Sequence, residues 1–158
     1  EEHNHEHLFT VEQSQKLRGK IKGCHTKNLF MKNKKDCFFL LSCLEEKKID
    51  LKKLKITLES KTLSFASHDK LNEILKIEPG SVSPFGLIND IDNKTKFFLD
   101  DDILKSDTVN FHPLVNNFTI NIKINDFIIF LKNINVELNI IDLKHYKIIE
   151  KYGRHNNK

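Results

Sequence analysis

The chain has 158 residues, of which 39% are apolar and 30% are charged, and its formal net charge is +4. This length allows one domain with a hydrophobic core that needs neither disulfides nor metals. No apolar run approaches the roughly 18 residues of a membrane-spanning helix, so we expect no membrane partner. The modest positive charge suits a partner that carries phosphates, but it does not predict one by itself.

The cysteines favour a reducing environment. Cys24, Cys37 and Cys43 form no C-x-x-C pair, and their odd number argues against a disulfide framework, so we expect a cytoplasmic location. No signal-peptide pattern opens the chain. Because the chain does not begin with Met, we expect a piece of a longer protein or a processed product.

In the first half of the chain, polar N-cap residues predict helices and apolar runs predict strands. Thr10, Asp50 and Ser67 are the expected N-caps, because their side-chain oxygens can accept backbone N–H groups. After a polar opening segment that we expect to be a loop or the end of a strand, we predict a helix at 9–19, strands at 26–31 and 36–43, a helix from 50 to about 58, a strand at 63–66 and a helix at 68–75.

The second half begins with a Gly-x-x-x-Pro turn from Gly80 to Pro84. We predict that the turn leads into a strand at 85–89, which forms a hairpin with a strand at 95–99 through the turn 92–94. Further predicted elements are strands at 108–111 and 118–122, a helix at 126–131 capped by Asn125, and a last strand at 136–142. After Leu143 the chain becomes basic and polar, so we expect residues 144–158 to be a solvated tail or a linker.

Strands and helices are interleaved in this prediction, with hairpins in place of regular βαβ units. We therefore expect an α/β protein of the α+β type. Its predicted core is a mixed, largely antiparallel sheet or partial barrel with flanking helices.

Two segments combine into a candidate site. In the first, Gly80 lets the backbone approach a ligand closely and Pro84 stiffens the exit of the turn. In the second, VNFHPLVN (109–116), His112 leaves an apolar strand and Pro113 restricts the chain that follows. A rigid turn that presents backbone N–H groups beside a held imidazole is suited to binding and polarising an ester carbonyl.

Four stretches, in this order, resemble one family: FTVEQSQKLRG (9–19), HTKNLFMKNKKD (25–36), LSFAS with IEPGSVSPFGLIND (63–67 and 77–90), and LDDDILKSDTVNFHPLVNNFTINI (99–122). They are similar to the prolyl-tRNA-synthetase-associated editing domains of the YbaK-like superfamily, and among these to the Ala-tRNA(Pro) deacylases. The likeness covers residues 6–142, so we expect the editing domain at 1–143. The region before the first stretch is shorter than in the family, which predicts an incomplete first layer.

The resemblance implies hydrolysis of the ester between an amino acid and the 3′-terminal adenosine of a tRNA. The expected substrate is alanine wrongly attached to tRNA(Pro), and the expected partners are the acceptor end of that tRNA and prolyl-tRNA synthetase, in cis or in trans. A pocket that excludes the larger proline would correct an error that the synthetic site discriminates by only about 1–3 kcal/mol. The alternatives are a deacylase for Cys-, Ser- or Thr-charged tRNA and a non-catalytic tRNA-docking module.

The resemblance also implies roles for individual residues. Lys27 would hold the phosphate next to the terminal adenosine and orient the ester, and its neighbour Asn28 would either hydrogen-bond the ribose or amino group or stabilise a turn. His112, with Phe111 beside it, would border the aminoacyl pocket or act as a general base. The turn would supply backbone amides for the carbonyl oxygen, and its candidate residues are Gly80, Ser81, Val82, Ser83 and Pro84.

We predict neither a nucleophile from the protein nor a metal or other cofactor. The cysteines have no evident histidine partner, and His3, His5 and His7 alternate as on one strand face without a fourth ligand at suitable spacing. The resemblance instead implies a route in which a positioned water, assisted by the substrate's own 2′-hydroxyl, would be sufficient. The lysines near Lys27 are either an ordinary solvated face or the path of an acceptor stem, and three neutralised phosphates would give a log–log salt slope of about −3.

Overall fold

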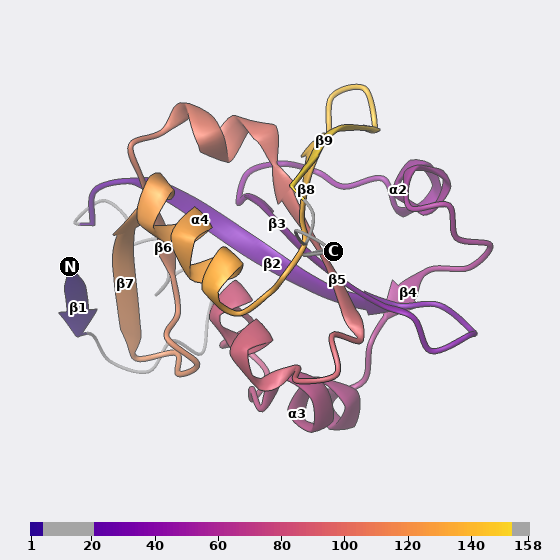
Figure 1. The fold of residues 1–158 in the computed structure, drawn as a ribbon, viewed down its shortest axis with the longest axis horizontal. Helices are drawn as coiled ribbons and strands as arrows, with labels where there is room; N and C mark the ends of the chain where they lie inside the picture. Colours follow the sequence, from indigo (N-terminus) through magenta and orange to yellow (C-terminus); the bar gives the residue numbers. More distant parts are fainter. Residues whose placement is uncertain (5–20, 153–158) are drawn as a thin grey trace, which may run out of the picture.

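The computed structural model describes residues 1–4 and 21–152, and within them nine strands form one sheet (Figure 1). The strands are β1 (Glu2–Asn4), β2 (Cys24–Lys32), β3 (Phe38–Leu44), β4 (Ser64–Phe65), β5 (Thr95–Asp100), β6 (Thr108–Phe111), β7 (Phe118–Lys123), β8 (Leu138–Asp142) and β9 (Lys147–Tyr152). The helices are α2 (Leu51–Thr57), α3 (His68–Leu75) and α4 (Ile124–Asn133), with the 3-10 helices η1 (Pro84–Asn89) and η2 (Asp101–Lys105).

The sheet is mixed and largely antiparallel, which confirms the predicted fold class. Its order is β1–β7–β6–β2–β3–β5–β8–β9, with β4 paired to β2 at the side. The pairs β2–β6, β3–β5 and β5–β8 are parallel, and the remaining pairs are antiparallel. The strand β2 therefore joins the part of the sheet that contains β6 and β7 to the part that contains β3, β5 and β8.

Alternating side chains of the strands enter two separate cores, one on each face of the sheet. The first, here called the α4-side core, contains apolar residues of α3, η1 and α4 and strand residues such as Phe30, Leu40 and Phe111. The second, the α2-side core, contains Leu54 of α2 together with strand residues such as Met31. In Figure 1, α4 crosses in front of the sheet and α2 lies at its right-hand end.

Two of the predicted helix starts are confirmed by their hydrogen bonds. The Asp50 carboxylate accepts the amides of Lys52 and Lys53 at the start of α2. The Ser67 hydroxyl accepts the amide of Lys70, and α3 occupies the predicted residues. Both caps satisfy amides that have no partner within the first turn of a helix.

The predicted Asn125 cap is wrong, because α4 begins at Ile124, two residues earlier than predicted. Its N-cap is Lys123, which makes no side-chain capping hydrogen bond. Instead, the amide of Ile124 donates to the carbonyl of Asp107 at 3.1 Å. A contact with a distant part of the chain thus replaces the local cap.

The predicted strand at 85–89 is also wrong, because these residues form η1. Ser83 caps the 3-10 helix by accepting the amide of Phe85, and Pro84 takes the first helical position, where its missing N–H costs nothing. A Cβ on Gly86 would lie 2.4 Å from the Ile77 Cδ1 atom, so close packing against the preceding segment requires glycine. A short apolar run does not reveal such packing.

The expected hairpin between 85–89 and 95–99 does not exist, although β5 lies where a strand was predicted. Both neighbours of β5, namely β3 and β8, run parallel to it. The Asp90 carboxylate accepts the amides of Lys94 and Thr95 at 2.9 and 2.7 Å, so it closes the turn before β5 without a strand on the other side.

The expected tail after Leu143 is wrong for residues 147–152, which form β9 and pair with β8. Apart from Ile148, which packs against the α2-side core, the residues of β9 are exposed. Backbone hydrogen bonds to β8 hold this edge strand in place. Because most of its side chains are exposed, the sequence shows no alternation of buried and exposed residues from which a strand could be predicted. The predicted helix at 9–19 lies outside the described residues, and none of the helices that are described is long and apolar enough to span a bilayer.

Candidate functional site

The Gly80 turn has the conformation expected of a rigid loop. Gly80 has a φ of 88°, a region that favours glycine. The amide of Ser81 donates to the carbonyl of Glu78 at 3.2 Å and closes the turn. Within the described part of the chain, the amides of Gly80, Val82 and Ser83 have no hydrogen-bond acceptor. The turn therefore has three unpaired amides among the described residues. The Ser81 amide, which was also predicted to bind the carbonyl oxygen, instead forms the hydrogen bond that closes the turn.

The loop between β6 and β7 holds His112. The Nδ1 atom of His112 lies 2.8 Å from the carbonyl oxygen of Phe118, so Nδ1 carries the proton and donates it. In the neutral imidazole, Nε2 is then the basic nitrogen. Leu114 in the same loop has a φ of 69°, which is strained for a bulky residue. Such strain is often found near functional sites.

The structure brings this loop and the Gly80 turn together, although they are far apart in the sequence. A Cβ added to Gly80 would lie 3.8 Å from the Asn116 Nδ2 atom. The rings of Phe85 and Phe111 meet edge to face, with centroids 5.8 Å apart. The two motifs that the sequence analysis combined are therefore neighbours.

Lys27 lies on the face of β2 that is turned away from the α4-side core. It is opposite Cys43 in the β2–β3 pair and on the same face as Leu29 and Met31 of the α2-side core. Its ammonium donates a hydrogen bond to the carbonyl oxygen of Lys47. No hydrogen bond joins this ammonium to the Gly80 turn, both of which are described.

The register of the sheet relates Lys27 to His112. The strands β2 and β6 run parallel, with His25 opposite Asn110. Because Phe111 enters the α4-side core, its neighbours Asn110 and His112 are directed to the other face. The pairing of β2 with β6 ends at His25 and Asn110, two residues before Lys27 and His112, so these two side chains are directed to the same face without being paired in the sheet.

Asn28 is directed the opposite way from Lys27. Its side-chain oxygen accepts a hydrogen bond from the Ser42 hydroxyl at 2.5 Å, which links β2 to β3. This contact is structural. Of the two roles considered for Asn28, the contact resembles the stabilising one, although it stabilises a pair of strands and not a turn.

A partly buried amide network, which the sequence analysis missed, fixes the start of β2. The Asn110 and Asn121 side chains both donate to the carbonyl of Lys22, and Asn121 also donates to the side-chain oxygen of Asn110. Gly23 has a φ of 94°, and a Cβ there would lie 2.6 Å from the Asn121 Nδ2 atom. The network sets the position from which β2 runs toward Lys27. Asparagines in strand positions were its only signal in the sequence.

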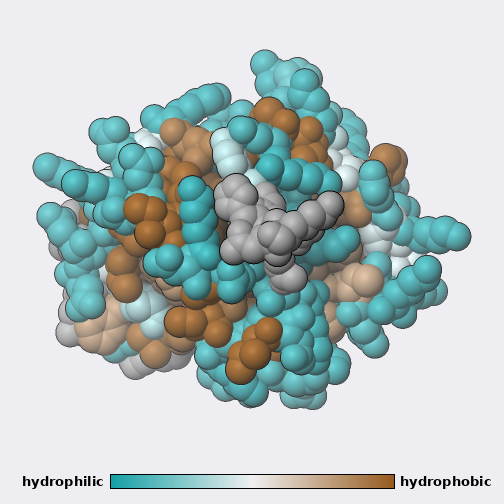
Figure 2. Space-filling view, viewed as in Figure 1, coloured by the Kyte–Doolittle hydropathy of each residue, from teal (hydrophilic) through white to brown (hydrophobic). Residues whose placement is uncertain are grey.

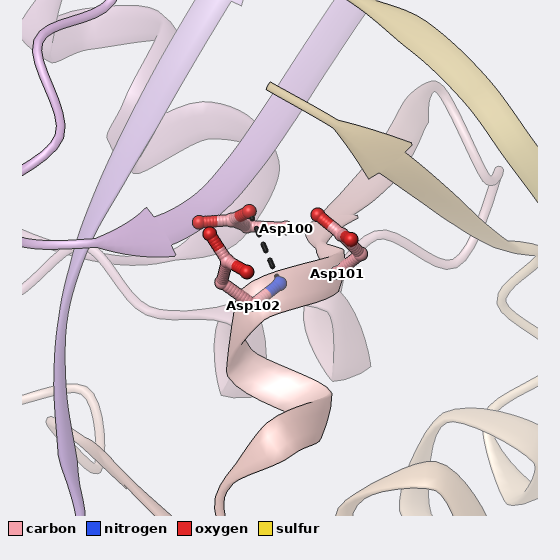
Figure 3. Close-up of side chains that lie close together, drawn as sticks. All are labelled: Asp100, Asp101 and Asp102. Atoms are coloured by element: carbon pink, nitrogen blue, oxygen red, sulfur yellow. Dashed lines mark hydrogen bonds between the residues drawn. The ribbon is translucent and has the colours of Figure 1, made fainter. Parts of the chain in front are cut away.

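Three carboxylates, those of Asp100, Asp101 and Asp102, gather where β5 meets η2 (Figure 3). Among the described residues, this is the only group of three or more His, Cys, Asp or Glu side chains close enough together to hold a metal ion. The Lys47 ammonium lies 2.6 Å from an oxygen of Asp100 and 2.6 Å from an oxygen of Asp102. The fully buried Asp100 also accepts the amides of Leu44 and Asp102.

Lysines stabilise the charge of Asp102, whereas burial and the neighbouring charges of Asp102 and Asp100 raise the pKa of Asp101. Hydrogen bonds from Lys105 and Lys47 hold the pKa of Asp102 below its ordinary value. Burial lowers the pKa of Lys47, but its bonds to Asp100 and Asp102 outweigh burial, so the pKa of Lys47 is raised. The carbonyl of Lys47 accepts a hydrogen bond from the Lys27 ammonium. Because the Lys47 side chain is held by Asp100 and Asp102, the acidic cluster anchors the segment that contacts Lys27.

The three thiols are expected to differ in reactivity. Burial raises the pKa of Cys43 to about 12, whereas Cys37 is exposed. Because the thiolate is the reactive form, iodoacetamide at pH 8 should modify Cys37 in the native protein and leave Cys43 unmodified. Mass spectrometry of tryptic peptides measures the fraction of each cysteine that is modified. Both residues should react in 6 M guanidinium (roughly the range for full unfolding), and rapid native labelling of Cys43 would contradict the buried position.

The model of the family described as the aminoacyl-tRNA editing domain matches residues 5–130, and the chain belongs to this family. The resemblance drawn from the sequence stretches is thereby confirmed.

The relatives carry names from prolyl-tRNA editing. "Prolyl-tRNA synthetase associated domain-containing protein 1" of Bos taurus is 36% identical over 134 residues, which cover 82% of this chain and 78% of the relative. "Prolyl-tRNA editing protein ProX" of Acetoanaerobium sticklandii is 34% identical over 117 residues, covering 73% and 71%. A solved structure assigned as a trans-editing enzyme for prolyl tRNA synthetase has the same fold, with a TM-score of 0.69 at 17% identity over 90% of this chain and 85% of that one.

Proposed function

We propose that this protein is an aminoacyl-tRNA deacylase that removes alanine from mischarged tRNA(Pro). Membership of the editing family and the prolyl-tRNA names of the relatives support this assignment. The observation that carries it is the contact between the Gly80 turn, which has unpaired amides, and the loop that holds His112.

In the proposed reaction, water attacks the carbonyl carbon of the ester that joins alanine to the terminal ribose. The carbonyl oxygen becomes negatively charged, and the bond to the ribose oxygen then breaks, with a proton transferred to that oxygen. The amides of Gly80, Val82 and Ser83 are the candidate donors to the negative oxygen. Loss of one such donor typically costs about 2.7–4 kcal/mol of transition-state stabilisation.

His112 would border the aminoacyl pocket, together with Phe111. With Nδ1 donating to the Phe118 carbonyl, the ring is held in one orientation. In the pocket-lining role the imidazole would contact the α-amino group or limit the size of the side chain, and in the second role it would act as a general base for the attacking water.

Lys27 would hold the phosphate that precedes the terminal adenosine. An ammonium has three donors, and the structure uses one of them for the Lys47 carbonyl. A phosphate bound by the others would fix the ribose relative to the Gly80 turn. Positioning of this kind lowers the barrier because the reacting groups no longer need to find their orientation.

The test compares tRNA(Pro) charged with alanine, proline, cysteine and serine. We expect the protein to accelerate release of alanine at least about 100-fold over release of proline, the range that a second, size-selective pocket can supply. Faster release of cysteine or serine would assign the chain to one of the alternative substrates. Tight binding of tRNA without turnover of any charged form would replace the deacylase with a non-catalytic docking module.

A further inference from the structure

A groove lies between α2 and the turn that joins β8 to β9. Its volume is about 280 Å3, and it is lined by Lys53, Ile56, Thr57, Lys144, His145 and Tyr146. Figure 1 shows α2 and this turn near each other at the upper right, and Figure 2 shows hydrophilic and hydrophobic side chains mixed there. The groove is thus part of the surface on the α2 side of the sheet.

Several contacts hold the walls of this groove in a fixed relation. The Tyr146 hydroxyl oxygen accepts the amide of Asp50 at 2.7 Å, and the Thr57 hydroxyl donates to the Tyr146 carbonyl at 2.6 Å. The Lys53 ammonium lies 5.7 Å from the centre of the Tyr146 ring. Tyr146 has a φ of 52°, a strained conformation that these bonds maintain.

The histidine of the groove is also oriented by its neighbours. Its Nδ1 lies 2.6 Å from an oxygen of Asp142, and the same carboxylate accepts the amides of Lys144 and His145. These bonds, the one from the imidazole first, lower the pKa of Asp142 to about 2. The Asp142 carboxylate is therefore hydrogen-bonded within the turn, and it is not one of the residues that line the groove.

The charge of the groove is that of an anion site. Among the described residues that line it, two are lysines, one is a histidine and none is acidic. A second groove, beside α3 and η1, has a volume of about 300 Å3 but is lined by Glu73, Asp90 and Asp92 as well as by Lys76 and Lys94. Grooves of similar size thus differ in the sign of their charge.

We propose that the groove between α2 and the β8–β9 turn binds the phosphodiester backbone of the tRNA whose 3′ end enters the active site. The inference rests on the proposed function for its choice of RNA. It is supported by the position of Lys27, which faces the same side of the sheet and contacts Lys47, three residues before the Asp50 cap of α2. Lysines that contact successive phosphates bind without regard to base sequence.

The test removes two charges from each groove and measures binding of uncharged tRNA(Pro) by fluorescence anisotropy across a salt series. The variant Lys53→Gln/Lys144→Gln should raise Kd on the order of ten-fold and make the log–log salt slope shallower by about 1 for each lysine. The control variant Lys76→Gln/Lys94→Gln makes the same change in net charge. It should leave Kd within about two-fold of the parent protein, because its lysines lie beside carboxylates.

Equal loss of affinity in both variants, or no loss in the first, would overturn the proposed groove. Circular dichroism of both variants shows whether they fold, and all four lysines are exposed. A single-turnover deacylation assay at saturating tRNA separates this inference from the proposed function. The groove variant should keep the parent rate there, whereas a parent protein that binds tRNA but hydrolyses no ester would refute the deacylase and leave the binding result valid.

Discussion

Replacing Lys27 with Ala is expected to lower the rate of Ala-tRNA(Pro) deacylation by about 100-fold or more. In the proposed mechanism the ammonium positions the 3′ end of the tRNA, and misplacement of the reacting ester by about 1 Å can cost 100-fold. The substitution also removes the hydrogen bond to the Lys47 carbonyl. Single-turnover measurement at saturating tRNA isolates the effect on the chemical step.

The control is Lys32→Ala on the same strand. Lys32 forms an exposed i, i+4 ion pair with Asp36 at 3.1 Å, and such pairs contribute little to stability. This variant should keep the parent rate within about two-fold. If Lys27→Ala folds normally and retains the full rate, Lys27 has no part in the reaction and the positioning role is wrong.

Replacing Phe127 with Ala is expected to lower the free energy of unfolding by about 3–5 kcal/mol. Phe127 is fully buried, and its ring meets those of Phe85, Phe97 and Phe111 at centroid distances of 6.3, 6.2 and 4.9 Å. These contacts join α4 to η1, β5 and β6. The cavity left by the ring would therefore loosen the support of both motifs of the candidate site.

The matched control on the same helix is Ile129→Ala, because Ile129 is 53% exposed. It should change the free energy of unfolding by no more than about 0.5 kcal/mol, as surface substitutions usually do. Urea denaturation followed by circular dichroism measures both variants. A loss below about 1 kcal/mol for Phe127→Ala, which is less than a buried ring contributes, would show that the aromatic cluster is not the centre of this core.

Much of the candidate site was predictable because its motifs are local. The Gly80 turn and the His112 loop are recognisable from glycine, proline and histidine at short spacings, and the structure sets them side by side. The anchoring of Lys27 was not predictable. It depends on the Lys47 carbonyl and, through the Lys47 ammonium, on Asp100 at the end of β5. No spacing along the chain reveals an ion pair between residues more than fifty positions apart.

The groove at α2 was likewise not predictable from the sequence, because its residues come from segments far apart along the chain. The lysines of α2 stand out in the sequence, but Lys144 was expected in a solvated tail. The pairing of β9 with β8 and the bond from Thr57 to Tyr146 bring Lys144 to the same groove as Lys53.

The amino-acid order was enough to predict the elements whose cause lies within a few residues. Side-chain caps at Asp50 and Ser67 and the apolar runs of β2 and β3 each stabilise their own segment, so their positions were predicted correctly. Long-range packing and pairing determined the rest. Gly86 of η1 packs closely against Ile77, and parallel neighbours fix β5. Neither was predictable, because these contacts arise between segments that meet only in the folded chain.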